Sequence, residues 1–264
     1  MMPIVTSCQE LPTLLKNGEI LNCTHRILCK IDYPSPVLRG FQGGCSDRKR
    51  YYYQIVMHYD LPDRLRDYGR VAKVDLQTGE VVRWSENLYL DHANDMTYHP
   101  GTHRILVCHN KPRYQHLSYL DADTLELVDQ TDLPFPFYAI EYNEKRDQYL
   151  IGLSGTREFR FLNADFSPTD DRIFRTAPLT DRCVKQGICA DDELLYFILW
   201  DGRHKAEPDF QNRIAVYDWN GDFRGLLHFN VGVQEPESIS IVSGQIHAVC
   251  GRSHPIIYRF TPET

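Results

Sequence analysis

The sequence predicts an all-β protein, a five-bladed β-propeller with four antiparallel strands in each blade. A first indication is a repeated phrase, because FQGGCSD at residues 41–47 returns as KQGICAD at residues 185–191. Three further segments fit the same template, with equivalent positions at Gln42, Asn94, Tyr138, Gln186 and Glu237. These residue numbers differ by 52, 44, 48 and 51. A period of about 40–50 residues with four short strands in each unit is typical of propeller blades.

The N-terminal segment is expected to close the ring. Residues 1–23 are expected to form a helical or irregular cap, and residues 24–32 (THRILCKID) read as a strand that belongs to no earlier unit. The fifth unit ends at PIIYRFTPET and lacks a fourth strand of its own. We therefore expect residues 24–32 to supply the outer strand of the last blade, which removes an open sheet edge. Residues 1–264 then form a single domain.

Within each unit, the four strands follow from apolar runs and polar turns. The second strand is apolar almost throughout, as in YYYQIV and LLYFILW, which is expected for a strand buried on both faces. Polar turns such as SDRKR and HPGTH follow the first strand, and turns such as LQTGE and WNGD follow the third. Tandem β-sandwiches are the alternative, but they do not predict five equivalent phrases at near-constant spacing.

Composition narrows the classes of function. The chain is 42% hydrophobic, which is enough for a buried core, and its net charge of −7 argues against a nucleic-acid-binding surface. No apolar run reaches the length of a membrane span, and the first residues do not resemble a secretory signal. We therefore expect a cytoplasmic protein without nucleic-acid or membrane partners. The sequence does not predict an oligomeric state.

The eight cysteines are expected to be free thiols, most of them buried. No CxxC pair occurs, and most cysteines lie inside apolar runs. Disulfides and a zinc site are the alternatives, and no HExxH or other metal-ligand spacing supports zinc. We expect no cofactor, with a cation in the central channel left as an open alternative.

The first strand of each propeller unit lines the central channel, so the five equivalent positions should form a ring near one mouth. Gln42, Asn94, Tyr138, Gln186 and Glu237 carry amide, phenol and carboxyl groups. Such groups in a concave site suit a small polar ligand. The alternative is that they only hydrogen-bond to one another and to water, which closes the ring.

Acid–base chemistry is expected from Glu237, Lys185 and His92 at the same mouth. A lysine, a histidine and a carboxyl group that lie close together shift each other's pKa values. We expect Glu237 to shuttle the proton, with Lys185 and His92 as electrostatic partners. The alternative is a structural ion pair between Lys185 and Glu235 or Glu237.

Loops between the second and third strands should surround the mouth with positive charge. They supply His109, Arg157, Arg203 and Arg252, which favour an anionic ligand such as a carboxylate or phosphate. The alternative is solvated loop charge. The loops at 57–69 and 200–212 are long enough to act as lids.

The phrases GFQGG and VDLQTGEVV resemble the plant and bacterial β-propeller type of glutaminyl cyclase. That family opens its first blade with a phrase like F-T-Q-G-L and continues with a V-D-L-x-T-G hairpin, so Gln42 and the hairpin Asp75–Gly79 match. Tyr138 matches an aromatic position of the family. Two features depart from it: Asn94 replaces the family's proton-shuttling glutamate, and the tryptophan-rich pocket is missing.

This resemblance implies cyclisation of an N-terminal glutamine with loss of ammonia. We expect Glu237 to supply the carboxylate in place of the family's glutamate. The sequence thus predicts a soluble propeller that binds a small polar, anionic molecule at its channel mouth. We expect an enzyme of the acyl-transfer and cyclisation, lyase or hydrolase type. The alternative is a non-catalytic module that binds proteins or, as a lectin does, sugars.

Overall fold

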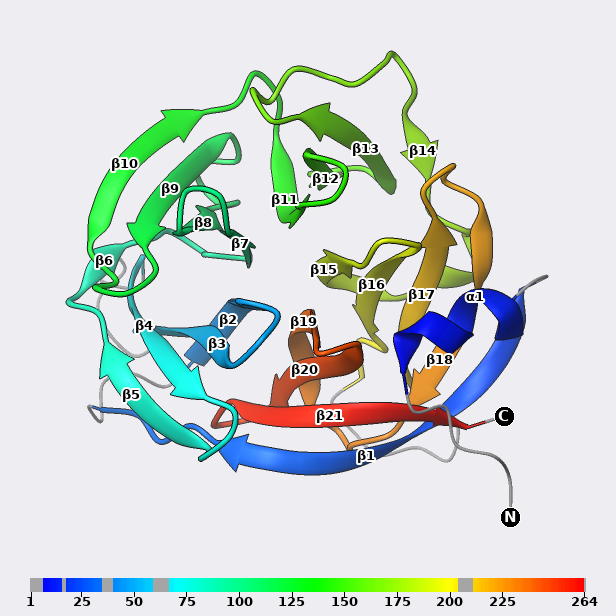
Figure 1. Ribbon diagram of the computed structural model, residues 1–264, viewed down its shortest axis with the longest axis horizontal. Coiled ribbons are helices and arrows are strands. Elements are labelled where there is room, and N and C mark those ends of the chain that lie inside the picture. The colour runs from blue at the N-terminus through cyan, green and yellow to red at the C-terminus, as the bar shows by residue number, and fades with distance from the viewer. Residues whose placement is uncertain (1–6, 16–17, 35–39, 59–66, 204–210, 264) are drawn as a thin grey trace.

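The computed structural model describes residues 7–15, 18–34, 40–58, 67–203 and 211–263. Its described elements are strands apart from η1 (Cys8–Glu10), α1 (Leu11–Leu14) and η3 (Pro178–Thr180). The strands surround a central axis, with the N-terminal and C-terminal strands side by side on the outer edge (Figure 1). No helix in these ranges is long and apolar enough to cross a membrane.

The sheets follow one another around the ring. The first contains β2 (Gly40–Ser46), β3 (Tyr51–Met57), β4 (Tyr68–Asp75) and β5 (Glu80–Trp84), with β6 (Leu88–Tyr89) paired to β4. The second contains β7 (Asp95–His99), β8 (Arg104–Cys108), β9 (His116–Asp121) and β10 (Leu127–Asp132). The third contains β11 (Phe137–Asn143), β12 (Gln148–Leu153), β13 (Glu158–Asn163) and β14 (Phe174–Arg175).

An eight-stranded sheet completes the ring. Four of its strands are β15 (Val184–Ala190), β16 (Leu194–Trp200), β17 (Asn212–Asp218) and β18 (Phe223–Phe229). The other four are β19 (Glu235–Val242), β20 (Gln245–Gly251), β21 (Ile256–Glu263) and β1 (Glu19–Lys30). Neighbouring strands are antiparallel within each group of four, and β1 joins the groups by a parallel pairing with β18.

Strand β1 differs from its predicted boundary. It begins at Glu19 rather than at residue 24, because residues 19–22 pair with β18. Residues 22–30 pair with β21, so the expected strand lies beside the last strand of the chain. The described part of the expected cap holds η1 and α1, and Leu11 in α1 and Leu15 directly after it are fully buried. Residues 1–6 lie outside the described residues.

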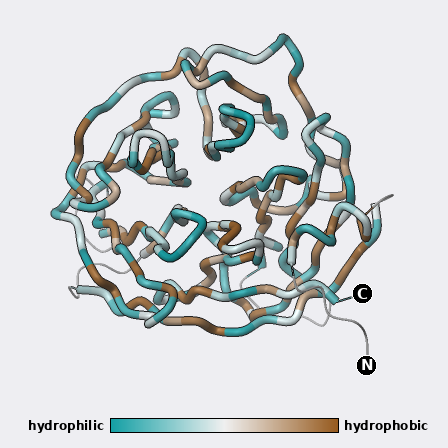
Figure 2. The backbone as a smooth tube through the Cα atoms, in the orientation of Figure 1, coloured by the Kyte–Doolittle hydropathy of each residue, from teal (hydrophilic) through white to brown (hydrophobic). Residues whose placement is uncertain are grey.

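The inner strands form the ring that carries the predicted positions. Strand β2 packs against β7, β7 against β11, β11 against β15, β15 against β19, and β19 against β2. The strands next to them are buried, as the apolar runs predicted, and all seven residues of β16 are buried. Apolar clusters fill the spaces between neighbouring sheets, and Figure 2 shows hydrophobic residues concentrated on the strands.

Two glycines allow the inner strands to approach closely. A Cβ atom on Gly43 would lie 2.4 Å from the Cα atom of Asp95, and one on Gly187 would lie 3.0 Å from the Cα atom of Ser238. Any larger residue at Gly43 would collide with backbone. These glycines therefore let neighbouring inner strands pack closely around the axis.

The cysteines are free thiols, as the sequence predicts. All eight cysteines are free, and six are buried. Burial raises the pKa of the Cys45, Cys108, Cys189 and Cys250 thiols well above the usual range, which keeps them as thiols. Most of the two long loops, at residues 59–66 and 204–210, lies outside the described residues.

Candidate functional site

A cavity of about 940 Å³ lies at the mouth of the channel. Its walls come from the loop after β8, the start of β11, the loop between β12 and β13, the end of β14 and the start of β15. We call it the mouth cavity. Its lining residues are Asn94, Asn110, Lys111, Tyr114, Pro136, Tyr138, Ser154, Gly155, Thr156, Arg157, Glu158, Arg175 and Lys185.

Four of the predicted site residues meet in the mouth cavity, and they are Asn94, Tyr138, Arg157 and Lys185. The other seven do not line it. These seven are Gln42, His92, His109, Gln186, Arg203, Glu237 and Arg252. The proposed catalytic group is therefore divided, because Lys185 faces the cavity and Glu237 does not.

Lys185 is the central charge of the cavity. Its ammonium lies 4.3 Å from the centre of the Tyr138 ring and donates to the backbone oxygen of Thr156. It pairs with no described carboxylate, so the alternative of an ion pair with Glu235 or Glu237 is wrong. Burial, together with the charge of Arg157, lowers the pKa of Lys185 to about 8.

Tyr138 forms the surface beneath that lysine. Its side chain is only 6% exposed and packs on Gly152, where an added Cβ atom would lie 2.4 Å from the ring. Burial raises the pKa of Tyr138 far above its usual value, so the phenol stays neutral. The ring offers its face to a cation, an interaction worth about 0.5–2 kcal/mol.

Asn94 holds the wall of the cavity in place. Its Nδ2 donates to the backbone oxygen of Tyr138 at 2.9 Å, and its Oδ1 accepts from Asn110 Nδ2 at 3.1 Å. Asn110 Oδ1 in turn accepts from the Ser154 hydroxyl at 3.4 Å. Both polar atoms of Asn94 are used in these bonds, which makes it a positioning residue in the described structure.

The cationic side of the cavity is more open. Arg157 donates to the backbone oxygens of Thr180 and Cys183, and its Nε lies 3.5 Å from Asp181 Oδ1. Arg175 reaches the same carboxylate only at 3.8 Å and remains largely exposed. Lys111 is exposed and has no described ion pair. Among the lining residues, Glu158 is the one carboxylate, beside these three cations and Lys185.

Glu237 lies in the ring at the axis, where it is 6% exposed and accepts no hydrogen bond from a described residue. Burial, and then the charge of Glu235, raises the pKa of Glu237 well above its usual value. This shift favours the protonated form of the carboxyl group. Gln186 Nε2 donates to Glu235 at 2.9 Å, and Gln42 is equally buried.

The remaining basic residues serve other contacts. His109 is fully buried between Asp91 Oδ2 and the Ser118 hydroxyl, each at 2.7 Å, so both of its ring nitrogens are engaged inside the protein. Arg203 is held by the carboxylate of Asp201. Arg252 is exposed in the loop after β20, outside the cavity.

His92 lies close to the cavity without lining it. Its backbone nitrogen donates to the backbone oxygen of Lys111 at 3.0 Å. Burial, followed by the charge of Lys111, lowers the pKa of His92, so the imidazole is neutral. Its contact is with the loop that carries Lys111, and the structure does not join it to Lys185 or Glu237.

Asp95 was not among the predicted site residues, yet it lies at the centre of the ring. Its Oδ2 accepts from the backbone nitrogens of Ile140 and Ile188, each at 3.2 Å, and thereby joins β7 to β11 and β15. Its Oδ1 is buried without a hydrogen-bond partner, and burial raises the pKa of the carboxyl group well above its usual value. Side chains alternate along a strand, so Asp95 and the neighbouring Asn94 point to opposite faces.

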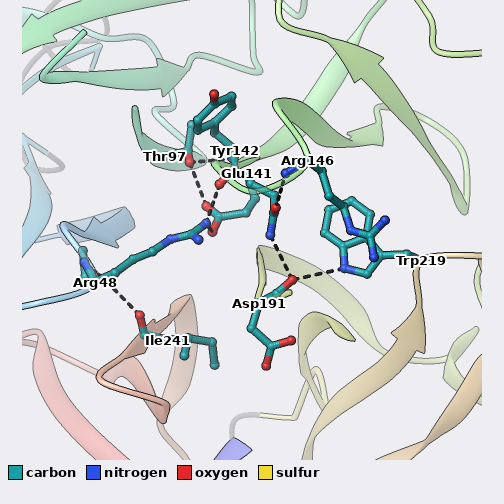
Figure 3. Close-up of polar contacts among 10 residues, drawn as sticks. Arg48, Thr97, Glu141, Tyr142, Arg146, Asp191, Trp219 and Ile241 are labelled. Carbon is teal, nitrogen blue, oxygen red and sulfur yellow. Dashed lines mark hydrogen bonds and ion pairs between the residues drawn. The ribbon is translucent and has the colours of Figure 1, made fainter. Parts of the chain in front are cut away.

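The opposite end of the inner strands is crossed by Arg48, as Figure 3 shows. Arg48 comes from the turn between β2 and β3 and donates to Glu141 Oε1 at 2.9 Å and to the backbone oxygen of Tyr142. Thr97 donates to the other carboxylate oxygen at 2.7 Å. Burial raises the pKa of Glu141 even though Arg48 opposes the shift. These contacts join three sheets across the axis.

The residues that sequence reasoning missed are mainly loop neighbours of those it found. Ser154, Thr156 and Glu158 surround Arg157 in the phrase SGTRE, and Asn110 follows His109. Selecting basic residues in these loops overlooked the hydroxyl, amide and carboxyl groups beside them. Arg175 had no signal, because it lies at the end of a two-residue strand.

Comparison with solved structures identifies the fold. A glutaminyl cyclase of Myxococcus xanthus has a TM-score of 0.64 at 13% identity, over 93% of this chain and 100% of that chain. A candidate exported protein of Bacteroides fragilis has a TM-score of 0.52 at 9% identity, over 93% and 100%. The RRP9 WD40 repeats have a TM-score of 0.50 at 8% identity, over 91% and 97%.

No protein-family model matches the sequence, and no curated protein sequence matches it. At such low identities the structural likeness shows the fold alone. The chain is an all-β protein with a β-propeller-like fold, as predicted.

Proposed function

We propose that this chain is a five-bladed β-propeller whose mouth cavity binds a small anionic molecule. To count five blades, we divide the eight-stranded sheet into two blades of four strands, which are joined by the pairing between β1 and β18. The observation that carries the function is Lys185, a half-buried ammonium group without a carboxylate partner in a cavity with three more cations.

An anion would complete the charge balance of this cavity. The four lining cations Lys111, Arg157, Arg175 and Lys185 outnumber the acids near them, which are Glu158 in the lining and Asp181 beside the two arginines. A carboxylate or phosphate oxygen that accepts from a partly desolvated cation forms a hydrogen bond about twice as strong as a neutral one. The Tyr138 ring and Pro136 give the same cavity apolar surface for the rest of the ligand.

The test is calorimetric titration with a panel of small carboxylates and inorganic phosphate. Wild type is expected to bind at least one anion, and Lys185→Gln to weaken its affinity at least about tenfold, equivalent to about 1.4 kcal/mol. Lys49→Gln is the matched control, because Lys49 is exposed in the turn at the other end of the inner strands. Equal affinity in Lys185→Gln and wild type would overturn the proposal.

Cyclisation of an N-terminal glutamine is the second candidate function. It is supported by Gln42 and its neighbouring hairpin, by the likeness to the Myxococcus cyclase fold and by the raised pKa of Glu237. A protonated carboxyl group near the channel could give a proton to departing ammonia. Glu237 does not line the mouth cavity, which makes this the weaker candidate.

Ammonia release from glutaminyl peptides tests this second candidate. Catalysis by Glu237 predicts turnover in wild type and a loss of about 100-fold or more in Glu237→Gln, because positioned proton transfer typically contributes 10²–10⁴-fold. Background rates in wild type would exclude the cyclase. Anion binding without turnover on any substrate would favour the non-catalytic binding module.

A further inference from the structure

We propose that Lys185 forms a covalent imine with a small carbonyl compound that carries an anionic group, such as a 2-oxo acid. This inference rests on the proposed anion binding and extends it by naming the substrate class. Two geometric features carry it: an amine without a carboxylate partner, and separate cations on the wall of the same cavity.

The surroundings of Lys185 favour a neutral amine. A surface lysine is surrounded by water, whereas Lys185 is half-buried between the Tyr138 ring and the Thr156 backbone oxygen. Desolvation, and then the charge of Arg157, lowers the pKa of Lys185, whereas the ring face by itself favours the ammonium form. A lysine amine desolvated beside another cation is the kind of nucleophile that attacks carbonyl groups.

The bound anion would hold the carbonyl group near this amine. Arg157 is largely committed to the backbone oxygens of Thr180 and Cys183, so Lys111 and Arg175 are the cations available to a carboxylate. A 2-oxo acid places a carboxylate and a carbonyl on adjacent carbon atoms. Holding the carboxylate orients the carbonyl and makes the attack effectively intramolecular.

The reaction balances without a further reactant. The lone pair of Lys185 Nζ attacks the carbonyl carbon, and one amine proton moves to the carbonyl oxygen. That oxygen takes a second proton from solvent and leaves as water. The nitrogen keeps its remaining proton in an iminium ion.

Reductive trapping with pyruvate and cyanoborohydride tests the proposal. Cyanoborohydride supplies a hydride to the iminium carbon, which leaves a carboxyethyl group on the lysine. Intact-mass measurement and peptide mapping are expected to find one such group, at Lys185. Lys185→Arg should abolish this labelling, Lys111→Gln should slow it severalfold, and Lys145→Arg, on a lysine outside the mouth cavity, should leave it unchanged.

The pH dependence provides a second readout in the wild-type protein. The labelling rate should rise as the pH approaches and passes about 8, since the neutral fraction of Lys185 grows there. The charged and titratable groups that face Lys185 in the cavity are Lys111, Tyr138, Arg157, Glu158 and Arg175. Lactate, which has the carboxylate but no carbonyl, should protect Lys185 from trapping.

The possible failures are distinguishable. Lactate binding without selective labelling of Lys185 would overturn the imine and leave anion binding intact. Absence of binding by lactate, by pyruvate and by every other anion of the calorimetric panel would overturn the proposed function as well. Equal labelling of Lys185 and of exposed lysines such as Lys49 would also overturn the imine. This comparison is made within the wild-type protein, so it does not depend on the folding of a variant.

Discussion

At the scale of single residues, several ionisable side chains are buried without an oppositely charged partner, and this shifts their pKa values. Lys185, Glu237 and the Oδ1 atom of Asp95 all lie in or beside the ring of inner strands, and none of them has an oppositely charged side chain beside it. Desolvation then disfavours the charged form of each group, lowering the pKa of the lysine and raising those of the acids. Groups with such pKa shifts concentrate at functional sites.

Asp95→Asn is expected to gain stability relative to wild type as the pH rises. The raised pKa means that the folded protein holds this proton more tightly than the unfolded chain does. The stabilisation from this bound proton is therefore fully present below the pKa of the unfolded chain, near 4. As the pH rises from there towards the raised pKa of the folded protein, the stabilisation falls by about 1.4 kcal/mol for each pH unit. An asparagine oxygen can still accept from Ile140 and Ile188.

Urea unfolding of both proteins at pH 5 and pH 8 measures this effect. The difference in unfolding free energy between Asp95→Asn and wild type should grow in favour of the variant at pH 8. A difference that is constant with pH would contradict the burial of an uncompensated carboxyl group.

Arg48→Ala is expected to destabilise the fold by about 2–3 kcal/mol, because it leaves Glu141 buried without its cation. Alanine tolerates the backbone φ of +64° at this position no worse than arginine does, so the effect reports the lost contacts. Lys49→Ala in the same turn is the control. Adding Glu141→Gln to Arg48→Ala should restore part of the lost unfolding free energy, measured in urea. A double variant whose loss equals the sum of the two single losses would contradict the coupling between Arg48 and Glu141.

At the scale of elements, the packing of one inner strand on the next depends on small residues. Gly43→Ala should destabilise the protein by about 1–3 kcal/mol or more, because its Cβ would overlap the backbone of Asp95 at 2.4 Å. Gly101→Ala is the control, since its nearest neighbour is the movable His99 side chain at 3.2 Å. Thermal unfolding compares the two, and equal melting temperatures would contradict close packing of β2 on β7.

Strands could be predicted from the sequence because their hydrophobic pattern is local. The run LLYFILW becomes the fully buried β16, and the closing segment becomes part of β1. The start of β1 could not be predicted, because it depends on a parallel pairing with β18 some 200 residues away in sequence, between partners such as Ile20 and Leu226. Register between distant strands leaves little trace in either strand alone.

At the scale of the whole molecule, the repeat predicts which residues start the inner strands, but it does not predict the cavity. The ring positions Gln42, Asn94, Tyr138, Gln186 and Glu237 are all buried, as their shared position in the repeat implies. The mouth cavity nevertheless lies on one side of the ring, over the second, third and fourth inner strands. That asymmetry arises from loops, whose conformations do not repeat.

Salt is expected to weaken ligand binding, although the whole chain has a net charge of −7. The cations of the mouth cavity lie within a few ångströms of the ligand. The negative charges elsewhere on the protein are farther away, and 0.1 M salt screens charges that are more than about 10 Å apart. Calorimetric affinity for the best anion should fall severalfold between about 0.02 M and 0.5 M salt. Lys185→Gln should show a shallower dependence, and an affinity independent of salt would contradict charge recognition.

The most direct test of the account is a crystal structure with a bromine-labelled carboxylate located by anomalous scattering. The account predicts the carboxylate in the mouth cavity, in contact with Lys185 or with its neighbours Lys111 and Arg175. The same experiment on Lys185→Gln should show the signal weakened or lost. Arg48 and Lys145 line a separate cavity, and an anion bound there, with the mouth cavity free of it, would contradict the central claim.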